Sequence, residues 1–161
     1  MTGREYGVLA GAGSAALLIG ALGFQAAGYV PCELCILQRW PHVAAVAIAV
    51  LLWLTGRVRL FAVLGMVAAA VAAGLAFYHT GVEIGWWAGP AHCSGGVGDI
   101  AQLSPRAALE RLQGTAVVRC DEVAWSFLGL SMAGWNAVFS AALAVIWGLA
   151  ATRAADGPRK A

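Results

Sequence analysis

Four long apolar stretches dominate the chain, and they are separated by short polar segments and by one longer polar region. The stretches cover residues 6–29, 36–54, 60–80 and 125–151. A helix needs about 20 mostly apolar residues to cross the hydrocarbon core of a bilayer, and each stretch is about that long. The pattern therefore predicts an all-α integral membrane protein, a four-helix bundle that forms a single domain.

The composition supports lipid as the surroundings of these stretches. The chain is 61% hydrophobic and only 11% charged, whereas soluble domains are about 45–50% apolar and about a quarter charged. So few charged side chains cannot cover a surface that faces water. The net charge of +2 is small and scattered along the chain, so a nucleic-acid partner is not expected.

Basic residues indicate the orientation of the four spans. An even number of crossings places both termini and the connection between the second and third spans on one side. That side carries six basic residues, Arg4, Arg57, Arg59, Arg153, Arg159 and Lys160. Because cytoplasmic segments are enriched in Lys and Arg, both termini are predicted to be cytoplasmic. The long loop, residues 81–124, then lies on the opposite side, and Ser104-Pro105 predicts a short helix within it that ends near Gln113.

All four cysteines lie on the non-cytoplasmic side or at its edge. Cys32 and Cys35 form a C-x-x-C motif at the start of the second span, while Cys93 and Cys120 bracket most of the long loop. A haem attachment motif would need histidine next, but Ile36 follows Cys35. A structural zinc site usually has two closely spaced ligand pairs, and Cys93 and Cys120 are 27 positions apart. No metal is therefore predicted.

The two cysteine pairs differ in what a disulfide would contribute to stability. A Cys93–Cys120 bridge would add about 3–4 kcal/mol by loop entropy, so a structural role stays open for that pair. A Cys32–Cys35 bridge closes a loop too small for a comparable gain, which favours redox chemistry there. Two hypotheses follow, a dithiol redox enzyme and a non-enzymatic membrane protein with two structural disulfides.

Arg39 and His79 are candidate partners of the C-x-x-C motif. Pro31 predicts that a helix begins here, and a helix N-terminus favours a thiolate. Arg39 lies four residues after Cys35, one turn along the same face, and an arginine inside a span suggests a functional role. His79 ends the third span at a similar depth. We therefore predict an activated cysteine at the lipid boundary with a guanidinium beside it and an imidazole nearby, able to relay electrons from a soluble thiol into the membrane.

These residues stand in motifs that resemble a known family. Residues 31–39 read PCELCILQR, similar to the P-C-x-L-C-x-x-x-R signature of the bacterial disulfide bond formation protein B (DsbB) family. The segment YHT at residues 78–80 and the segment WSFLGLSM at residues 125–132 resemble two further family motifs. A vitamin K epoxide reductase-like enzyme would share a cysteine relay and a helix bundle. The motif after Cys120 and the placement of both cysteine pairs argue against that alternative.

The resemblance implies an activity, its partners and a location. Members of the family reoxidise a DsbA-like thiol oxidase of the periplasm and pass the electrons to ubiquinone or menaquinone. The expected location is the bacterial inner membrane, with the cysteines on the periplasmic side and the quinone pool in the surrounding bilayer. By position, Arg39 and His79 would hold the quinone headgroup, and Arg39 would also stabilise the neighbouring thiolate.

The resemblance also implies a role for each cysteine. Cys93 would form the mixed disulfide with the partner, and Cys120 would resolve it. Cys120 would then pair transiently with Cys32, which would leave Cys35 as a thiolate against the quinone. Together the four cysteines would carry electrons from the long loop to the lipid boundary.

The second span has two further features. Gln38 stands where some family members carry an acidic residue, so the site loses a negative charge there. Pro41 lies inside the span and cannot donate a backbone hydrogen bond, which predicts a kink. Both residues are close to Arg39, so both bear on how the predicted site is arranged.

Overall fold

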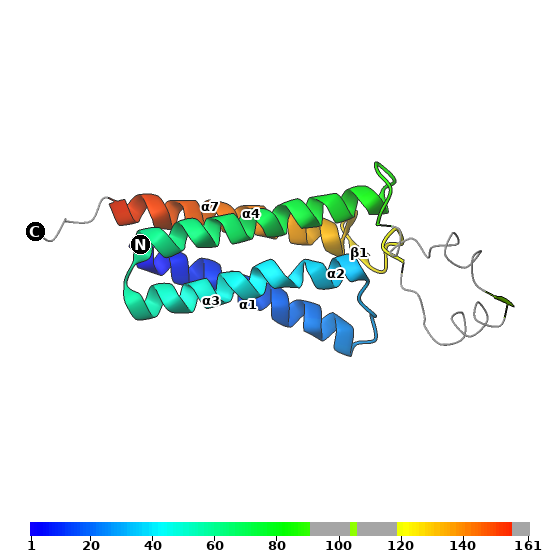
Figure 1. Cartoon of the computed structure of the whole chain (residues 1–161), viewed down its shortest axis with the longest axis horizontal. Helices are drawn as coiled ribbons and strands as arrows, with labels where there is room; N and C mark the ends of the chain where they lie inside the picture. Colours follow the sequence, from blue (N-terminus) through cyan, green and yellow to red (C-terminus); the bar gives the residue numbers. More distant parts are fainter. Residues whose placement is uncertain (91–103, 106–118, 156–161) are drawn as a thin grey trace, which may run out of the picture.

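The chain folds into a bundle of long helices that lie side by side (Figure 1). The computed structural model describes residues 1–90, 104–105 and 119–155. Its elements are α1 (Gly3–Ala26), α2 (Glu33–Leu37), α3 (Arg39–Thr55), α4 (Val58–Glu83), β1 (Ser126–Phe127), β2 (Leu130–Ser131) and α7 (Met132–Ala155). Within this described part, four segments are long and apolar enough to cross a membrane, α2 and α3 together forming one of them. The predicted multi-pass four-helix bundle is thereby confirmed.

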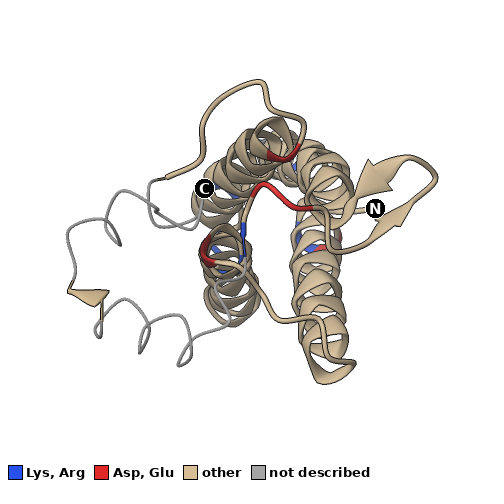
Figure 2. Ribbon diagram, turned by 90° about the vertical axis from the view of Figure 1, so that its right-hand side faces the viewer, with Lys and Arg blue, Asp and Glu red and all other residues tan. Residues whose placement is uncertain are grey.

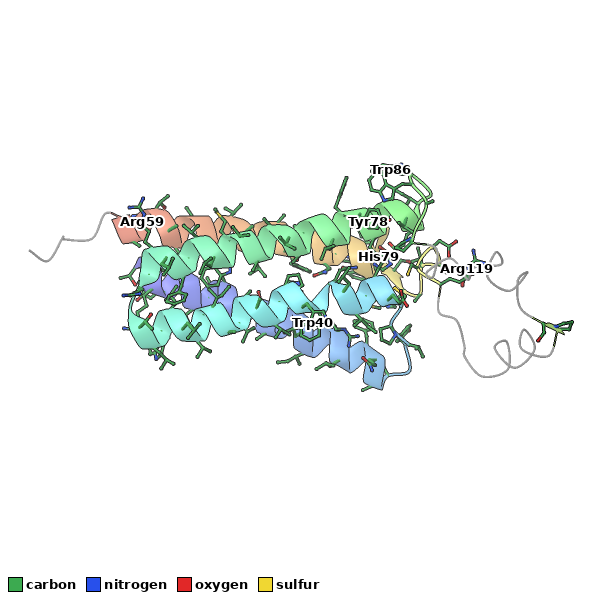
Figure 3. All side chains as sticks on the ribbon, viewed as in Figure 1. Trp40, Arg59, Tyr78, His79, Trp86 and Arg119 are labelled. Atoms are coloured by element: carbon green, nitrogen blue, oxygen red, sulfur yellow. The ribbon has the colours of Figure 1, made fainter. Side chains whose placement is uncertain are left out.

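The two ends of the bundle differ in what they carry. The N-terminus, the α3–α4 turn and the end of α7 lie at one end (Figure 1), and Figure 3 shows Arg59 there. The opposite end, here called the cysteine end, is formed around Cys32, Cys35, His79 and Cys120. Figure 2 looks onto the cysteine end and shows acidic residues there. The bundle thus has the charge asymmetry that the sequence indicated.

The second span is interrupted at Gln38, as Pro41 predicted. Cys32 is the N-cap of α2, and its sulfur accepts a hydrogen bond from the Cys35 backbone N–H at 3.3 Å. The helix ends at Leu37, and α3 begins one residue after Gln38. Pro41 has no N–H to donate to the Leu37 carbonyl, which explains the break. The Gln38 side chain at this interruption is buried.

The fourth span begins later than predicted. The apolar run from residue 125 was expected to be helical throughout, but α7 starts at Met132. The preceding residues form a small antiparallel hairpin that pairs Ser126 with Ser131 and Phe127 with Leu130. Its turn contains Leu128 and Gly129, with φ of 50° and 80°, and two successive positive φ values suit a tight hairpin turn and exclude a helix. Hydropathy alone does not reveal such a turn.

Part of the long loop lies outside the described residues. The short helix predicted from Ser104-Pro105 to about Gln113 falls there, apart from Ser104 and Pro105 themselves. Cys93 also lies outside the described part. The structure therefore bears on three of the four cysteines.

Small residues allow the helices to approach closely. The core cluster consists mainly of alanines around one large side chain, and its buried members are Ala10, Ala49, Leu52, Ala62, Ala69, Leu143, Trp147 and Ala150. Gly65 of α4 lies against the Trp147 ring, so near that a Cβ would be 2.5 Å from its carbon atoms. Gly11 of α1 likewise meets Ala49 of α3, and a Cβ on Gly11 would overlap the Ala49 Cβ. Close packing of this kind is how spanning helices associate without a hydrophobic drive from water.

Substituting Gly11 by alanine is expected to destabilise the bundle by about 1–3 kcal/mol, because Ala49 offers no flexible atoms that could give way. The measurement is unfolding of the purified protein in mixed micelles. Gly20 of α1 is the matched control, since nothing lies within 4 Å of a Cβ built there. If Gly20→Ala lost as much stability as Gly11→Ala, helix contact would not be the cause.

Candidate redox site

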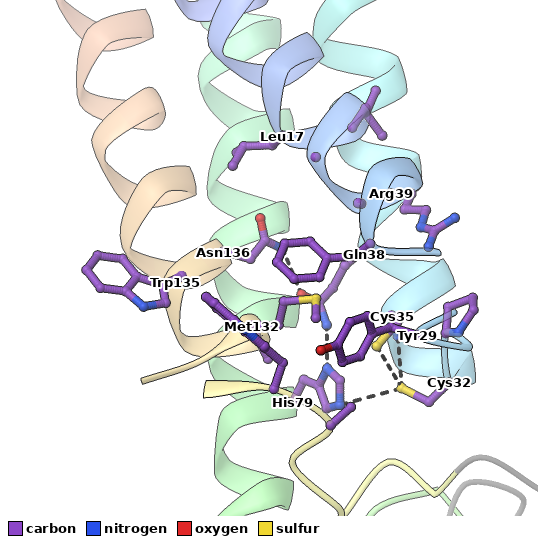
Figure 4. A pocket seen from close by; sticks show the side chains of 18 of the residues that line it. Leu17, Tyr29, Cys32, Cys35, Gln38, Arg39, His79, Met132, Trp135 and Asn136 are labelled. Carbon is purple, nitrogen blue, oxygen red and sulfur yellow. Dashed lines mark hydrogen bonds between the residues drawn. The ribbon is translucent and has the colours of Figure 1, made fainter. Parts of the chain in front are cut away.

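Two sulfurs and an imidazole meet at the cysteine end (Figure 4). Cys32 Sγ lies 3.0 Å from Cys35 Sγ and 3.6 Å from His79 Nε2. Both cysteines are free thiols, Cys32 buried and Cys35 half-buried. The start of α2 supplies the sulfurs and α4 supplies the imidazole, which reaches the motif from 47 positions away. The structure thus places His79 beside the C-x-x-C motif, at the depth expected from the sequence.

The contacts of Cys32 favour a negative charge on its sulfur over one on Cys35. Its sulfur accepts from the Cys35 backbone N–H and lies within hydrogen-bonding distance of the Cys35 thiol and of His79. These contacts, the Cys35 thiol foremost, lower the pKa of Cys32 to about 4, although burial raises it. The family resemblance implied a thiolate at Cys35 in the state in which Cys32 is paired with Cys120. With both thiols free, the N-cap position and the imidazole assign it to Cys32 instead.

Alkylation should report this thiolate directly. We expect the reaction rate of Cys32 with iodoacetamide to stay nearly constant between about pH 6 and about pH 8, because the thiolate is already formed throughout that range. An ordinary thiol, with a pKa of about 8.5, would react roughly tenfold faster for each pH unit. Peptide mass spectrometry assigns the rate to Cys32, and the unfolded protein, which lacks these contacts, is the control. An ordinary rise in the folded protein would contradict the assignment.

Arg39 occupies a different position from the one predicted. Its Nη1 donates to Gln25 Oε1 of α1 at 2.7 Å, and its Nε is buried without a hydrogen-bond partner among the described residues. No hydrogen bond of the described residues joins Arg39 to Cys35, and Figure 4 shows the guanidinium apart from both sulfurs. The expected contact rested on the spacing of four residues alone, and the guanidinium instead reaches the neighbouring helix α1. Arg39 nevertheless lines the same cavity as Cys35.

A buried amide orients the imidazole of His79. Gln38 Nε2 donates to His79 Nδ1 at 2.7 Å, and Gln38 Oε1 accepts from Asn136 Nδ2 at 2.7 Å. Because an amide nitrogen only donates, His79 Nδ1 must be an acceptor. The ring proton of a neutral imidazole is then on Nε2, the nitrogen that faces Cys32. Gln38 thereby fixes the tautomer in which His79 donates to the sulfur.

The same polar network continues into the bundle through two further side chains. His42 Nε2 lies 3.0 Å from Asn136 Oδ1, and Ser140 Oγ donates to that oxygen at 3.3 Å. His42 and Ser140 are buried. Sequence reasoning noted Gln38 only as a position without an acidic charge, and it did not identify Asn136 or Ser140 as site residues. Polar side chains within apolar spans are the signal that could have marked them.

Glu83 completes the cluster from the last turn of α4. Its side chain is 6% exposed, and its Oε1 lies 4.0 Å from His79 Nε2. Ser131, on β2, donates from Oγ to Glu83 Oε2. The hairpin before α7 therefore positions the Ser131 hydroxyl against the buried Glu83 carboxyl. Beyond its spacing of four residues from His79, nothing in the sequence marks Glu83.

The loop that precedes β1 brings a third cysteine to the site. Cys120 is disulfide-bonded and 1% exposed. It packs in one buried cluster with Cys32, Leu34 and Val82. The structure thus places a cysteine of the second pair next to the first pair, which is the arrangement that a relay between the pairs requires.

A mostly apolar cavity of about 420 Å³ opens beside the sulfurs. Cavities of this size and character are typical of sites for small organic molecules. Two buried nitrogens on its walls, Arg39 Nε and His42 Nδ1, have no partner among the described residues. Aromatic and aliphatic side chains of α1, α7 and the loops supply much of the lining, among them Leu17, Phe24, Tyr29, Trp135 and Phe139.

The two sulfurs and the imidazole also have the residue types of a metal site. Ligand atoms of Cys32, Cys35 and His79 lie within 4.8 Å of one another. Two thiolates on a tetrahedral zinc ion would be about 3.8 Å apart, given Zn–S bonds of about 2.3 Å. The observed 3.0 Å is shorter and matches a thiol hydrogen-bonded to a thiolate. The geometry therefore favours redox chemistry at this site.

Comparison with known proteins decides the family. The family model described as "Disulfide bond formation protein DsbB" matches residues 3–150, which include the first three spans, most of the fourth span and all four cysteines. The chain belongs to the DsbB family. This membership makes it a redox protein of disulfide bond formation, and it argues against two purely structural disulfides and against a vitamin K epoxide reductase-like enzyme.

Individual relatives of the DsbB family agree with this assignment. The disulfide bond formation protein B of Xanthomonas campestris pv. campestris (strain 8004) is 34% identical over 142 residues, which cover 83% of this chain and 80% of the relative. The protein of the same name from Marinobacter nauticus is 36% identical over 129 residues, covering 74% of this chain and 73% of the relative. No solved structure gives a significant match.

Proposed function

We propose that this DsbB-family protein is a membrane thiol:quinone oxidoreductase. It reoxidises a DsbA-like thiol oxidase and passes the electrons to ubiquinone or menaquinone, thereby sustaining disulfide bond formation. The inner membrane holds it with both termini in the cytoplasm and the cysteine end in the periplasm. The observation that carries the proposal is the position of the Cys32–Cys35 pair, whose sulfurs lie beside His79 and border an apolar cavity.

Electrons enter through the second cysteine pair. A thiolate of the partner attacks the Cys93–Cys120 disulfide, forms a mixed disulfide with Cys93 and releases Cys120 as a thiolate. The second thiol of the partner then displaces Cys93, which leaves the partner oxidised. The Cys120 thiolate next attacks Cys32 and breaks the Cys32–Cys35 disulfide, and the presence of Cys32 and Cys120 in one buried cluster supports this step. The exchange leaves Cys35 as the free thiolate at the cavity. The Cys32 thiolate belongs to a different state, in which the first pair is reduced and both of its cysteines are free.

The energetics explain why a strong oxidant is needed. Thiol oxidases of the DsbA type have potentials of about −120 mV, whereas structural disulfides lie below about −300 mV. Oxidising such a partner with an ordinary disulfide would be uphill by roughly 180 mV, or about 8 kcal/mol for two electrons. Stabilising the Cys32 thiolate favours the reduced pair and so makes its disulfide more oxidising. A membrane quinone, when bound, would serve as the final acceptor of the two electrons.

The cavity offers suitable groups for a quinone ring. The Arg39 and His79 side chains line it together with Cys35, and the remainder of the wall is largely apolar. Arg39 Nε is a buried donor that lacks a partner among the described residues, and a quinone carbonyl is the kind of acceptor it would satisfy. In this proposal Arg39 acts on the ring rather than on the cysteine pair.

The test combines purified protein, a reduced DsbA-type thioredoxin-fold partner and a short-chain soluble ubiquinone under anaerobic conditions. Quinone absorbance and partner thiols are followed together. We expect each dithiol lost to be matched by a quinone reduced, with no reaction when the membrane protein is left out. Thiol loss without quinone reduction would overturn the assignment of the acceptor.

A further inference from the structure

A buried carboxyl competes with a sulfur for the N–H group of His79. Nε2 of His79 lies between Cys32 Sγ at 3.6 Å and Glu83 Oε1 at 4.0 Å. Glu83 Oε2 is already occupied by the Ser131 hydroxyl, so Oε1 is the oxygen that faces the imidazole. A thiolate and a carboxylate therefore flank one donor in a site with little access to water. Two negative charges so placed repel each other strongly in a medium of low dielectric constant.

His79 cannot relieve this repulsion by taking up a second proton without breaking the network behind it. That proton would have to sit on Nδ1, where Gln38 Nε2 already donates at 2.7 Å. Gln38 cannot simply turn its amide around, because its Oε1 accepts from Asn136 Nδ2. The oxygen of Asn136 is in turn occupied by His42 and Ser140. Glu83 is therefore the group that can accept a proton at the least cost.

We propose that Glu83 takes up a proton when the Cys32–Cys35 disulfide is reduced and releases it when that disulfide re-forms. In the reduction, two electrons break the S–S bond and two protons enter. One proton forms the Cys35 thiol and the other converts the Glu83 carboxylate to the carboxylic acid, while Cys32 becomes the thiolate. The net charge of the site stays the same, because the charge lost by Glu83 appears on Cys32.

The part that Glu83 plays in turnover rests on the proposed function as a thiol oxidase. Electrons leave the dithiol for the acceptor, and the Glu83 proton becomes available at the same moment and beside the same cavity, which Glu83 also lines. Other titratable groups on the cavity wall are Tyr29, Arg39, His42, Arg119 and Glu122. Arg119 is paired with Asp121 at 2.7 Å, so it is engaged elsewhere.

Infrared difference spectroscopy tests the proton directly and requires no quinone. The full-length protein in micelles is reduced with a chemical dithiol, and the oxidised spectrum is subtracted. We expect the C=O stretching band of a protonated carboxyl to appear on reduction and to shift in heavy water. The band should be lost in Glu83→Gln and should return, at a shifted frequency, in Glu83→Asp. It should also be lost in Cys35→Ala, which ties it to the first cysteine pair.

Glu33→Gln is the matched control, because Glu33 adjoins Cys32 but is exposed, and its band should match that of the unmodified protein. A band that survives in Glu83→Gln, or no band in the unmodified protein, would overturn the inference even if a variant folds poorly. The outcome is separable from that of the quinone assay. A missing band with intact quinone turnover rejects the Glu83 role alone, whereas a present band without turnover rejects the proposed acceptor alone.

Discussion

Replacing Cys35 by alanine is expected to abolish steady-state quinone reduction, lowering the rate by a factor on the order of 10³ or more. The variant retains Cys32 but can no longer form the first-pair disulfide, so electrons that reach Cys32 have no path to the cavity. Folding should change little, because Cys35 is a small, half-buried free thiol and the substitution removes about 1 kcal/mol or less of stability. The measurement is quinone absorbance after mixing with reduced partner, alongside thermal unfolding.

The same variant separates loss of electron transfer from loss of partner recognition. Cys93 and Cys120 remain, so Cys35→Ala should still oxidise partner dithiol once, in proportion to protein, and then stop. A purely structural role for the cysteines predicts the reverse, with altered stability and no redox defect. Sustained turnover by Cys35→Ala would show that the electrons leave by a route other than the first pair.

Much of the fold could be predicted from the order of apolar and polar residues in the sequence. Each span is a run of apolar residues, and lipid imposes helices on such runs because backbone groups must be satisfied internally. Local chemistry also predicted the break in the second span, since the missing N–H of Pro41 acts within its own helix. The start of α7 could not be read in this way. Leu128 is apolar, and only the backbone conformation that it shares with Gly129 shows that the chain turns there.

The candidate site likewise has features that the sequence predicts and features that only the packed helices show. The C-x-x-C spacing and the depth of His79 brought three residues together correctly, because both depend on position along a helix. The partner of Arg39 and the network behind His79 depend on how the helices are rotated about their axes. Gln38 and Asn136 are 98 positions apart, and neither span alone reveals that their amides meet. That rotation also decides which sulfur carries the charge.

Replacing His79 by phenylalanine is expected to lower the rate of quinone reduction by about 10²–10³-fold, the usual loss when a buried donor to a developing or resident anion is removed. His79 contributes to the lowered pKa of Cys32, so the pKa of that thiol should rise in the variant. With a raised pKa, a smaller fraction of Cys32 is thiolate at low pH. The variant should therefore lose the most activity on the acid side and recover part of it as the pH rises.

Gln38→Leu provides the comparison that distinguishes a chemical role of His79 from a packing role. It leaves the imidazole in place but removes the donor to Nδ1, so the ring is free to carry its proton on either nitrogen. We expect a smaller loss of rate than in His79→Phe, together with a partial shift of the Cys32 alkylation profile toward that of an ordinary thiol. If His79→Phe lowered activity equally at every pH and left the alkylation profile unchanged, the imidazole would support the helices and not the thiolate. The pH profile therefore tests whether the charge on Cys32 depends on the N–H group that Gln38 directs toward it.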